Sequence, residues 1–446
     1  MMRGQGLRRK GRAGGGLRIV SIVTAPRESA PPRDRGDLSG VRFLPPISAP
    51  FAGAYALAQI GAYLSFMPLL QIILPLRAAA IDPAHKAALL SHLMISGAMT
   101  AGFANLLAGA LSDRTRSRIG RRRPWMIAGL AGMMAAYGLI ARAHSSAGLF
   151  AGLLAFQVTF NMFFAALGAI VADRVPDHQK GMVSALLSLG YPIGTVLGVG
   201  LFGSLATHAG WRLPALGLSV ILLATPFILS LREDPIDPRP APSSRRMLWP
   251  RITNDFGLAI IARLLTFTAL NLIQTYLLYD LQERGTHGAW LPAGLSPEQA
   301  VARLIGLSTV VYVATALTCG RLSDLAARRK IFVIFGALGL SASVIGIALS
   351  PGWLVLMGAY LAYGGAMGCY HAIDNALMVQ VLPSTADVGR DLGLVNLSNT
   401  LPQVLSPVLA LICIRQGHQS YQQLFLIGAV LAMASAGFTG MIRGVR

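Results

Sequence analysis

Long apolar stretches alternate with short polar segments from Phe51 onward. The stretches have about 18 to 28 residues each, and a helix needs about 20 apolar residues to cross the hydrocarbon of a bilayer. The twelve stretches run roughly over 51–76, 87–111, 125–141, 148–171, 181–205, 214–231, 256–281, 303–319, 331–349, 354–381, 392–414 and 422–442. The pattern predicts an all-α polytopic membrane protein with twelve transmembrane helices.

The composition supports a membrane protein. Charged residues make up 13% of the chain and hydrophobic residues 54%, whereas soluble proteins carry about 25% charged residues. The net charge of +20 would indicate a nucleic-acid partner in a soluble protein. In a membrane protein, the position of the basic residues along the chain decides what that charge means.

Basic residues fall mainly on one side of the predicted membrane. With the N-terminus inside, thirty of the 38 Lys and Arg lie in inner segments, seven lie in outer loops (Arg77 and Arg284 among them) and only Arg263 lies within a helix. Because Lys and Arg in short loops stay on the cytoplasmic side, we expect both termini in the cytoplasm of a multi-pass protein of the plasma or inner membrane. The charge then sets orientation, and no nucleic-acid partner is expected.

The twelve helices divide into two halves. Residues 1–50 are basic and rich in Gly and Pro, and we expect a disordered cytoplasmic tail there. We predict a first six-helix bundle over 51–231, a cytoplasmic linker over 232–255 and a second bundle over 256–446. The motif at 109–113 recurs 211 residues later at 320–324. Two pseudo-symmetric bundles suit transport by alternating access.

The segment from Gly109 to Trp125 reads GALSDRTRSRIGRRRPW. It resembles the loop between helices two and three of the major facilitator superfamily, in the extended form found in sucrose symporters and in glycoside-pentoside-hexuronide:cation symporters. The resemblance implies the major facilitator fold and a secondary transporter of a small-molecule substrate. We expect a monomer.

The resemblance also implies a gate on the cytoplasmic side. Gly109 permits close helix approach, Asp113 can meet a helix N-terminus or a guanidinium, and Gly120 allows a tight turn. The alternative is that the arginines only fix topology and bind anionic lipid. The residues assigned to the gate are Gly109, Asp113, Arg114, Arg118, Gly120, Arg121, Arg122, Arg123, Asp173 and Asp324.

Ionisable groups inside a membrane point to function, and here they are Arg263, His371 and Asp374. At about 1.5 Å per residue, Arg263 and Asp374 each lie some 12 Å from the inner ends of helices seven and ten. The resemblance places both helices at the central cavity. One hypothesis is that Asp374, with His371 beside it, takes up a proton and releases Arg263 as substrate binds. The alternative is a permanent structural ion pair.

Neutral polar side chains form stripes on the predicted helices. Sugars need neutral donors and acceptors together with aromatic faces, although each of these residues could instead bond a neighbouring helix. The resemblance implies that sodium-coupled glycoside symporters carry acids in the membrane part of their first half, whereas helices one to six carry none here. This departure disfavours sodium coupling and favours proton coupling or uncoupled transport. The predicted substrate-binding residues are Gln59, Tyr63, Gln157, Asn161, Asn271, Gln274, Tyr370, Asn396 and Asn399.

Other functions find little support in the sequence. The string GVGLFG at 198–203 lies in an apolar helix, where the fourfold spacing of Gly190, Gly194 and Gly198 indicates helix packing instead of a dinucleotide site. No nucleotide or hydrolase motif occurs, and the three cysteines have no metal-binding spacing. We therefore expect no enzyme activity, cofactor or metal.

The leading prediction is a proton-coupled sugar or glycoside transporter. The alternatives are an efflux transporter, favoured by Met and Phe residues in helices three and four, and a non-transporting membrane receptor.

Overall fold

The computed structural model describes residues 46–200, 209–231, 253–285, 290–326, 328–381, 395, 397–414 and 418–444. Residues 44–446 form one compact unit. All regular elements in the described ranges are helices, and nine of these helices are long and apolar enough to cross a membrane. The prediction of an all-α membrane fold is confirmed. The predicted tail and most of the predicted linker lie outside the described residues.

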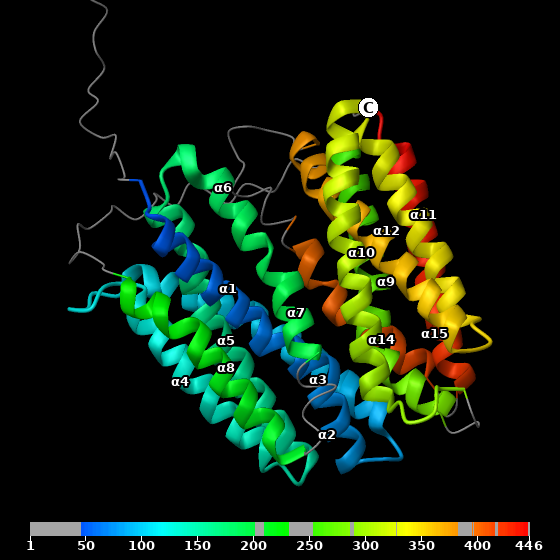
Figure 1. Ribbon diagram of the computed structural model, residues 1–446, viewed down its shortest axis with the longest axis horizontal. Helices are drawn as coiled ribbons and strands as arrows, with labels where there is room; N and C mark the ends of the chain where they lie inside the picture. The colour runs from blue at the N-terminus through cyan, green and yellow to red at the C-terminus, as the bar shows by residue number, and fades with distance from the viewer. Residues whose placement is uncertain are drawn as a thin grey trace, which may run out of the picture. The chain divides into compact units, whose positions relative to one another are not determined.

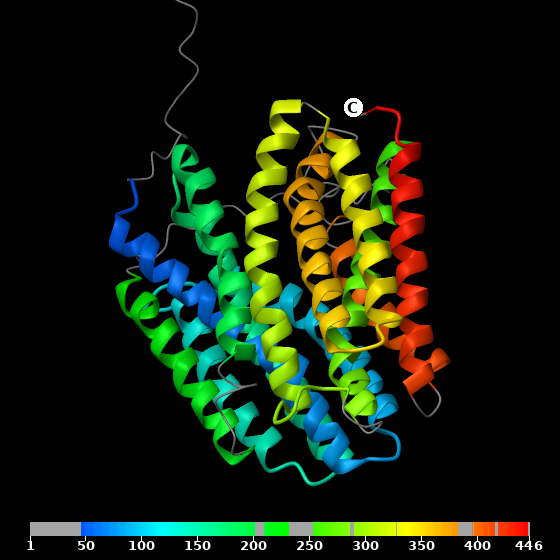
Figure 2. The ribbon, with the colours of Figure 1, turned by 45° about the vertical axis from the view of Figure 1, so that its right-hand side comes forward.

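The helices form two six-span halves (Figure 1). The first half contains α1 (Ala49–Pro68), η2 (Leu69–Ile73), α2 (Leu74–Ile81), α3 (Lys86–Arg114), α4 (Arg123–Ala141), α5 (Ser146–Arg174), α6 (Asp177–Ser188), α7 (Gly190–Gly200) and α8 (Ala209–Ser230). The second contains α9 (Asn254–Gly285), α10 (Pro297–Ala326), α11 (Arg329–Ala348), α12 (Trp353–Gln380), α14 (Pro402–Cys413) and α15 (His418–Met441). We call the end where α1 begins and α15 ends the proximal end, and the end where α2 joins α3 the distal end (Figure 2).

Prolines interrupt three of the spans. In the first span, Pro68 ends α1 and is followed by the single π-helical turn η2, whose hydrogen bond runs from the Leu74 N–H to the Leu69 carbonyl. The fifth span breaks between α6 and α7 just before Pro192, and the eleventh breaks just before Pro402. Proline has no N–H to continue the helical ladder, so the chain bends where these spans reach the centre of the fold.

The two halves repeat one contact at the distal end. Arg77, in α2, donates hydrogen bonds to the last carbonyls of α4, and Arg284, in α9, does the same for α11. The acceptors are Ile140, Ala141 and Ala143 for Arg77, and Ile347, Ala348 and Ser350 for Arg284. Each second-half residue lies 207 positions after its first-half counterpart. A guanidinium satisfies the unpaired carbonyls at a helix C-terminus and complements its dipole.

This contact corrects the placement of both arginines in outer loops. The helices extend beyond the expected ends, to Ile81 in α2 and Gly285 in α9. Asp280 is fully buried in α9 and pairs with Arg284 at 2.8 Å. A carboxylate and a guanidinium one turn apart neutralise each other, which lets the helix continue where the polar pattern predicted a loop.

Glycines allow α7 to pack closely on α1. A Cβ atom at Gly194 would lie 2.7 Å from the Cβ of Tyr63 and 2.9 Å from the Ile60 carbonyl oxygen. A Cβ at Gly190 or Gly198 would also come within 3.0 Å of α1. The interpretation of these glycines as a helix-packing surface is confirmed.

Candidate solute-binding cavity

A cavity of about 360 Å³ lies between the two halves. It is lined by η2 and four helices of the first half together with α9, α12 and the eleventh span. The lining residues are Tyr63, Phe66, Met67, Leu70, Gln71, Met94, Ala98, Gln157, Tyr191, Phe267, Leu270, Asn271, Gln274, Thr275, Met367, His371, Asn399, Gln403, Ser406 and Pro407. None of these side chains is an Asp, Glu, Lys or Arg.

Several polar atoms in this wall have no partner within the described structure. They are Gln71 Oε1, Gln157 Oε1, His371 Nε2 and Ser406 Oγ. Gln71, Gln157 and Ser406 are only 7%, 4% and 0% exposed. An unsatisfied buried polar group costs about 1–3 kcal/mol, so native proteins rarely leave one unpaired without a role. Four such atoms around one cavity indicate a binding site for a solute that forms hydrogen bonds.

Aromatic rings form the wall contributed by the first half. Tyr63 meets Tyr191 edge to face with centroids 5.5 Å apart, and Phe66 stacks on Phe160 at 5.1 Å. The second half adds Phe267. The cavity therefore offers flat apolar faces on one side and hydrogen-bonding groups around them.

A buried ion pair stands directly behind the cavity wall. Arg263 of α9 pairs with Asp374 of α12, and their side chains are only 5% and 4% exposed. The amide oxygen of Asn399 accepts from Arg263 Nη2 at 2.9 Å and from Nε at 3.1 Å. The guanidinium also lies over Phe267, 5.0 Å from the ring centroid. The imidazole of His371 stacks on the same phenyl ring, with the two ring centroids 5.2 Å apart. The structure thus brings the three predicted coupling residues together.

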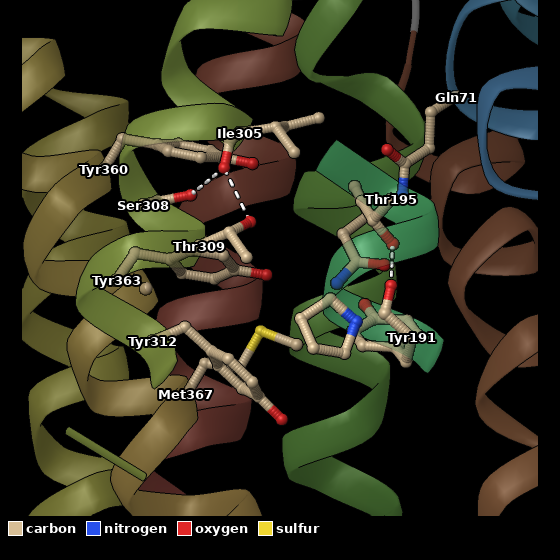
Figure 3. Close-up of a pocket in the computed structure, with 13 residues that line it drawn as sticks. Gln71, Tyr191, Thr195, Ile305, Ser308, Thr309, Tyr312, Tyr360, Tyr363 and Met367 are labelled. Carbon is tan, nitrogen blue, oxygen red and sulfur yellow. Dashed lines mark hydrogen bonds between the residues drawn. The ribbon is translucent and has the colours of Figure 1, made fainter. Parts of the chain in front are cut away.

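A smaller pocket of about 40 Å³ adjoins the cavity, with which it shares Gln71, Tyr191, Gln274 and Met367. Figure 3 shows side chains from α10 and α12 on one side of this pocket and those from η2 and α7 on the other. Its Ser and Thr hydroxyls donate to carbonyls of their own helices, as Thr195 does to Tyr191 at 2.8 Å. These hydroxyls already have hydrogen-bond partners, whereas the four unpartnered polar atoms all line the larger cavity.

Five of the predicted substrate-binding residues line the cavity, namely Tyr63, Gln157, Asn271, Gln274 and Asn399. Three others do not. Gln59 packs against α7, where a Cβ atom at Gly190 would lie 2.8 Å from the Gln59 side chain. The amide oxygen of Asn161 accepts a hydrogen bond from Asn105 at 3.1 Å. Tyr370 is fully buried beside Gly336. These three side chains serve helix packing. Asn396 lies outside the described residues.

Gln71 lines the cavity but is not among the predicted substrate-binding residues. This residue lies eight positions after Tyr63, so the stripe of Tyr63 and Met67 continues to it, one helical turn at a time. The π-helical turn η2 holds Gln71 at the junction of the cavity and the smaller pocket. Single π turns inside α-helices are frequent at functional sites, but the sequence gives no sign of one beyond the flanking prolines.

The basic motif builds a compact ion cluster at the proximal end of the first half. Asp173, at the end of α5, accepts from Arg121 at 2.6 Å and from Arg122 at 3.0 Å. Arg122 also reaches Asp113 and Ser112. Burial alone would raise the pKa of Asp173, but hydrogen bonds and charge from Arg121 and Arg122 outweigh it and lower the pKa. The cluster ties α3, α4 and α5 together.

The other motif residues are placed differently. Gly120 has φ 105°, a left-handed conformation that glycine adopts readily. Arg114 and Arg118 are exposed and Arg123 is half-buried. Among the described residues, nothing lies within 4 Å of where a Cβ at Gly109 would be, so the expected close helix approach is not found there. The side chain of Asp324, in α10, lies outside the described residues.

The halves are joined by polar contacts at the distal end. Lys86 of α3 pairs with Glu283 of α9 at 3.2 Å. The Tyr279 hydroxyl donates to the Pro75 carbonyl at 2.8 Å, and the hydroxyls of Tyr276 and Ser91 lie 2.6 Å apart. We call these contacts the distal latch.

In the described residues, helices of two related halves surround a central cavity, which is the arrangement that secondary transporters use. The sequence matches the Major Facilitator Superfamily over residues 51–295 and 256–444, and the chain belongs to that superfamily. No curated protein matches the chain by sequence.

Solved transporter structures share the fold. One is a bacterial homologue of the human lysosomal transporter Spinster, in an inward-facing and unoccupied conformation (TM-score 0.68, 13% identity, 89% of this chain and 98% of that chain). Another is the peptide transporter POT in complex with sulfate (TM-score 0.68, 15% identity, 90% and 96%). A third is the nucleoside transporter NupG (TM-score 0.66, 14% identity, 88% and 98%). These likenesses establish the fold and leave the solute to the chemistry of the cavity.

Proposed function

We propose that the protein is a proton-coupled secondary transporter of a small neutral polar solute, a sugar or a glycoside. The unpartnered polar atoms of the cavity carry this proposal. They require a guest with several hydrogen-bonding groups, and a lining without Asp, Glu, Lys or Arg favours a neutral one. The cavity volume is within the range of about 300–1,000 Å³ that is usual for small-molecule sites.

The aromatic wall supports the same solute class. The C–H faces of a sugar ring are apolar, and Tyr63 and Phe66 present ring faces and edges to them, while Gln157, Asn271 and Gln274 supply donors and acceptors to hydroxyls. A sugar therefore matches both sides of the cavity. Its hydroxyls would replace the water that an empty polar cavity holds.

Proton coupling is supported by the buried ion pair. A carboxylate in a membrane segment is costly unless it is paired or neutralised. Asp374 has both options, since its carboxylate can remain paired with Arg263, or it can accept a proton and release Arg263. In the described residues of the first half, Asp113 and Asp173 lie at helix ends, so Asp374 is the cavity-side carboxylate that suits this role.

We further propose that the proximal end faces the cytoplasm of the plasma or inner membrane. Thirty of the 38 basic residues fall on that side of the chain's predicted topology. The Arg121 and Arg122 cluster then lies on the cytoplasmic side, where it is placed to act in a gate, and the distal latch closes the opposite side. A monomer contains the complete cavity.

Uptake into proteoliposomes tests the function. Labelled glucose, xylose, sucrose, maltose and methyl glucoside are supplied with a pH gradient, a sodium gradient or neither. We expect accumulation of at least one sugar with the pH gradient alone. Accumulation driven only by sodium would refute proton coupling, and no uptake of any sugar would refute the solute class.

Two variants test the coupling residue. Asp374→Asn should abolish pH-driven accumulation while retaining counterflow, since the neutral amide mimics the protonated carboxyl. Asp280→Asn is the matched control, because Asp280 is also buried and paired with an arginine but belongs to the distal end. It should still accumulate sugar. Unchanged accumulation in Asp374→Asn would end the coupling proposal.

A second candidate is export of an apolar metabolite or drug. It is favoured by the Phe, Met and Leu residues in the cavity wall, which come from α1, η2, α3, α9 and α12. The Met and Phe residues of helices three and four that suggested efflux are not in this lining. Increased drug sensitivity of a deletion strain, together with no sugar uptake, would establish this function in place of the first.

A further inference from the structure

Asn399 connects the cavity to the buried ion pair. Its side chain lines the cavity, and its amide oxygen accepts two hydrogen bonds from Arg263, from Nη2 at 2.9 Å and from Nε at 3.1 Å. An amide oxygen has two lone pairs, so Arg263 occupies both. The amide nitrogen of Asn399 is left for other partners.

The guanidinium is therefore held from two directions. Asn399 binds Nε and Nη2, and Asp374 binds Nη1. If Asp374 takes up a proton, the charge of Arg263 loses its carboxylate partner while the hydrogen bonds to Asn399 remain. A neutral carboxyl is a weaker acceptor than a carboxylate, so a solute oxygen in the cavity can compete with Asp374 for the Nη1 donors.

The helix that carries Asn399 is interrupted two residues after it. Residues 397–400 are helical, but Leu401 is a turn residue and Pro402 begins α14. Because Pro402 has no N–H, the ladder between the two segments is weakened at that point. Broken helices at the centre of a membrane are where transporters bind solutes and ions.

We propose that Asn399 is a positioning residue that makes solute affinity depend on the protonation of Asp374. It holds the guanidinium of Arg263 directly behind the cavity wall, so that protonation of Asp374 lets a solute hydroxyl oxygen compete with the carboxyl for the Nη1 donors. The proton comes from water and is held by Asp374 while the solute is bound. This inference rests on the proposed proton-coupled transport.

The surroundings contain few other groups that titrate. Tyr370 and His371 are on the same helix as Asp374, and Tyr312 of α10 reaches His371 Nδ1 at 3.4 Å. The neighbouring part of α11 contributes Gly336 against Tyr370, and α15 contributes Ser435, which bonds Thr266 of α9 at 2.7 Å. Among the described groups packed here, Arg263 is the cation that faces Asp374.

The test is the pH dependence of equilibrium binding, measured with full-length protein in nanodiscs and the sugar of the panel that the wild type accumulates. By linkage, a proton and a solute that favour each other's binding change each other's affinity by the same factor, typically about 5- to 150-fold. We expect a change of that order in the wild-type Kd between about pH 5 and pH 8. In Asn399→Ala the change should be lost.

Asn271→Ala is the matched control. Asn271 is also a cavity-lining amide, but its side chain bonds the Phe267 carbonyl at 2.8 Å. This variant should weaken binding equally at each pH and keep the wild-type ratio. Asn399→Leu keeps the size of the side chain without its acceptor and replaces Asn399→Ala in the test if that variant does not fold. The pH dependence of its Kd should also be lost.

The outcomes separate the inference from the function on which it rests. If the wild type binds and accumulates no sugar of the panel, the proposed function fails and the inference falls with it. If the wild type shows a pH-dependent Kd and both Asn399 variants keep the same dependence, only the inference fails. Counterflow that persists in the Asn399 variants while pH-driven accumulation is lost would support the positioning role over a merely structural one.

Discussion

The distal latch should control how often the two halves part at that end. In Tyr279→Phe the hydroxyl that donates to the Pro75 carbonyl at 2.8 Å is lost, while the ring beneath Lys86 remains, with the ammonium 5.2 Å from its centroid. A typical intramolecular hydrogen bond contributes about 0.5–1.5 kcal/mol. When the end parts, water can solvate both groups, so the substitution destabilises the joined state selectively.

The expected shift follows from that energy. Since about 1.4 kcal/mol corresponds to a factor of ten, Tyr279→Phe should raise the ratio of parted to joined molecules about 2- to 12-fold. Glu283→Gln should do less. Lys86 and Glu283 keep 20% and 27% of their side-chain surface exposed, and ion pairs near water are worth about 0.2–1 kcal/mol, which is at most about a fivefold change.

Distances between spin labels measure this equilibrium. Ala84 and Ala293 are exposed at the distal end, one in each half, and Ala84→Cys with Ala293→Cys in a background without the native cysteines provides a label pair. Electron–electron double resonance then reports the fraction of molecules with a long distance. An unchanged distribution in Tyr279→Phe, or a larger effect from Glu283→Gln, would refute the reasoning.

Three further predictions concern stability, measured as apparent Tm in detergent. Gly194→Ala should destabilise by about 1–3 kcal/mol because its Cβ would meet α1 backbone and side-chain atoms within 3.0 Å, whereas Gly168→Ala, with nothing within 4 Å, should not; equal Tm values would contradict this. Asp173→Asn should lower Tm at pH 7, and the difference should shrink in acid: the folded pKa is lowered, so the stabilisation exists above the unfolded pKa and is lost as pH falls through the folded pKa. A difference that grows in acid would show the sign to be wrong. Arg263→Met should cost about 3–5 kcal/mol by leaving a buried carboxylate unpaired, and adding Asp374→Leu should restore most of it; additive losses would show that the two residues do not act as a pair.

The helical layout was predictable because a bilayer imposes a minimum apolar length on every span. The ends of the spans were not predictable to the same degree. The sequence pattern places Arg284 in a loop after a span predicted to end at 281, yet Asp280 and Arg284 neutralise each other within α9. A pattern of single residues cannot show such cancellation, since it depends on a contact within the helix and on carbonyls from α11.

The candidate site was only partly predictable for a related reason. Matching depths along two helices pointed to Arg263 and Asp374, and the structure brings them together. Spacing on one helix shows which residues share a face but not where that face points. Tyr370 and His371 are adjacent, and the helical rotation between them places Tyr370 in the core and His371 at the cavity.

Arg77 and Arg284 close the distal corner of each half with bonds to carbonyls of that same half. A chain cut between Leu231 and Thr253 would leave each arginine on the same fragment as its acceptors. We expect the two six-helix fragments, produced separately in one membrane, to fold and to reassemble through the distal latch and the cavity wall. Each half would then assemble with the other as one subunit does with its partner, without a peptide link between them.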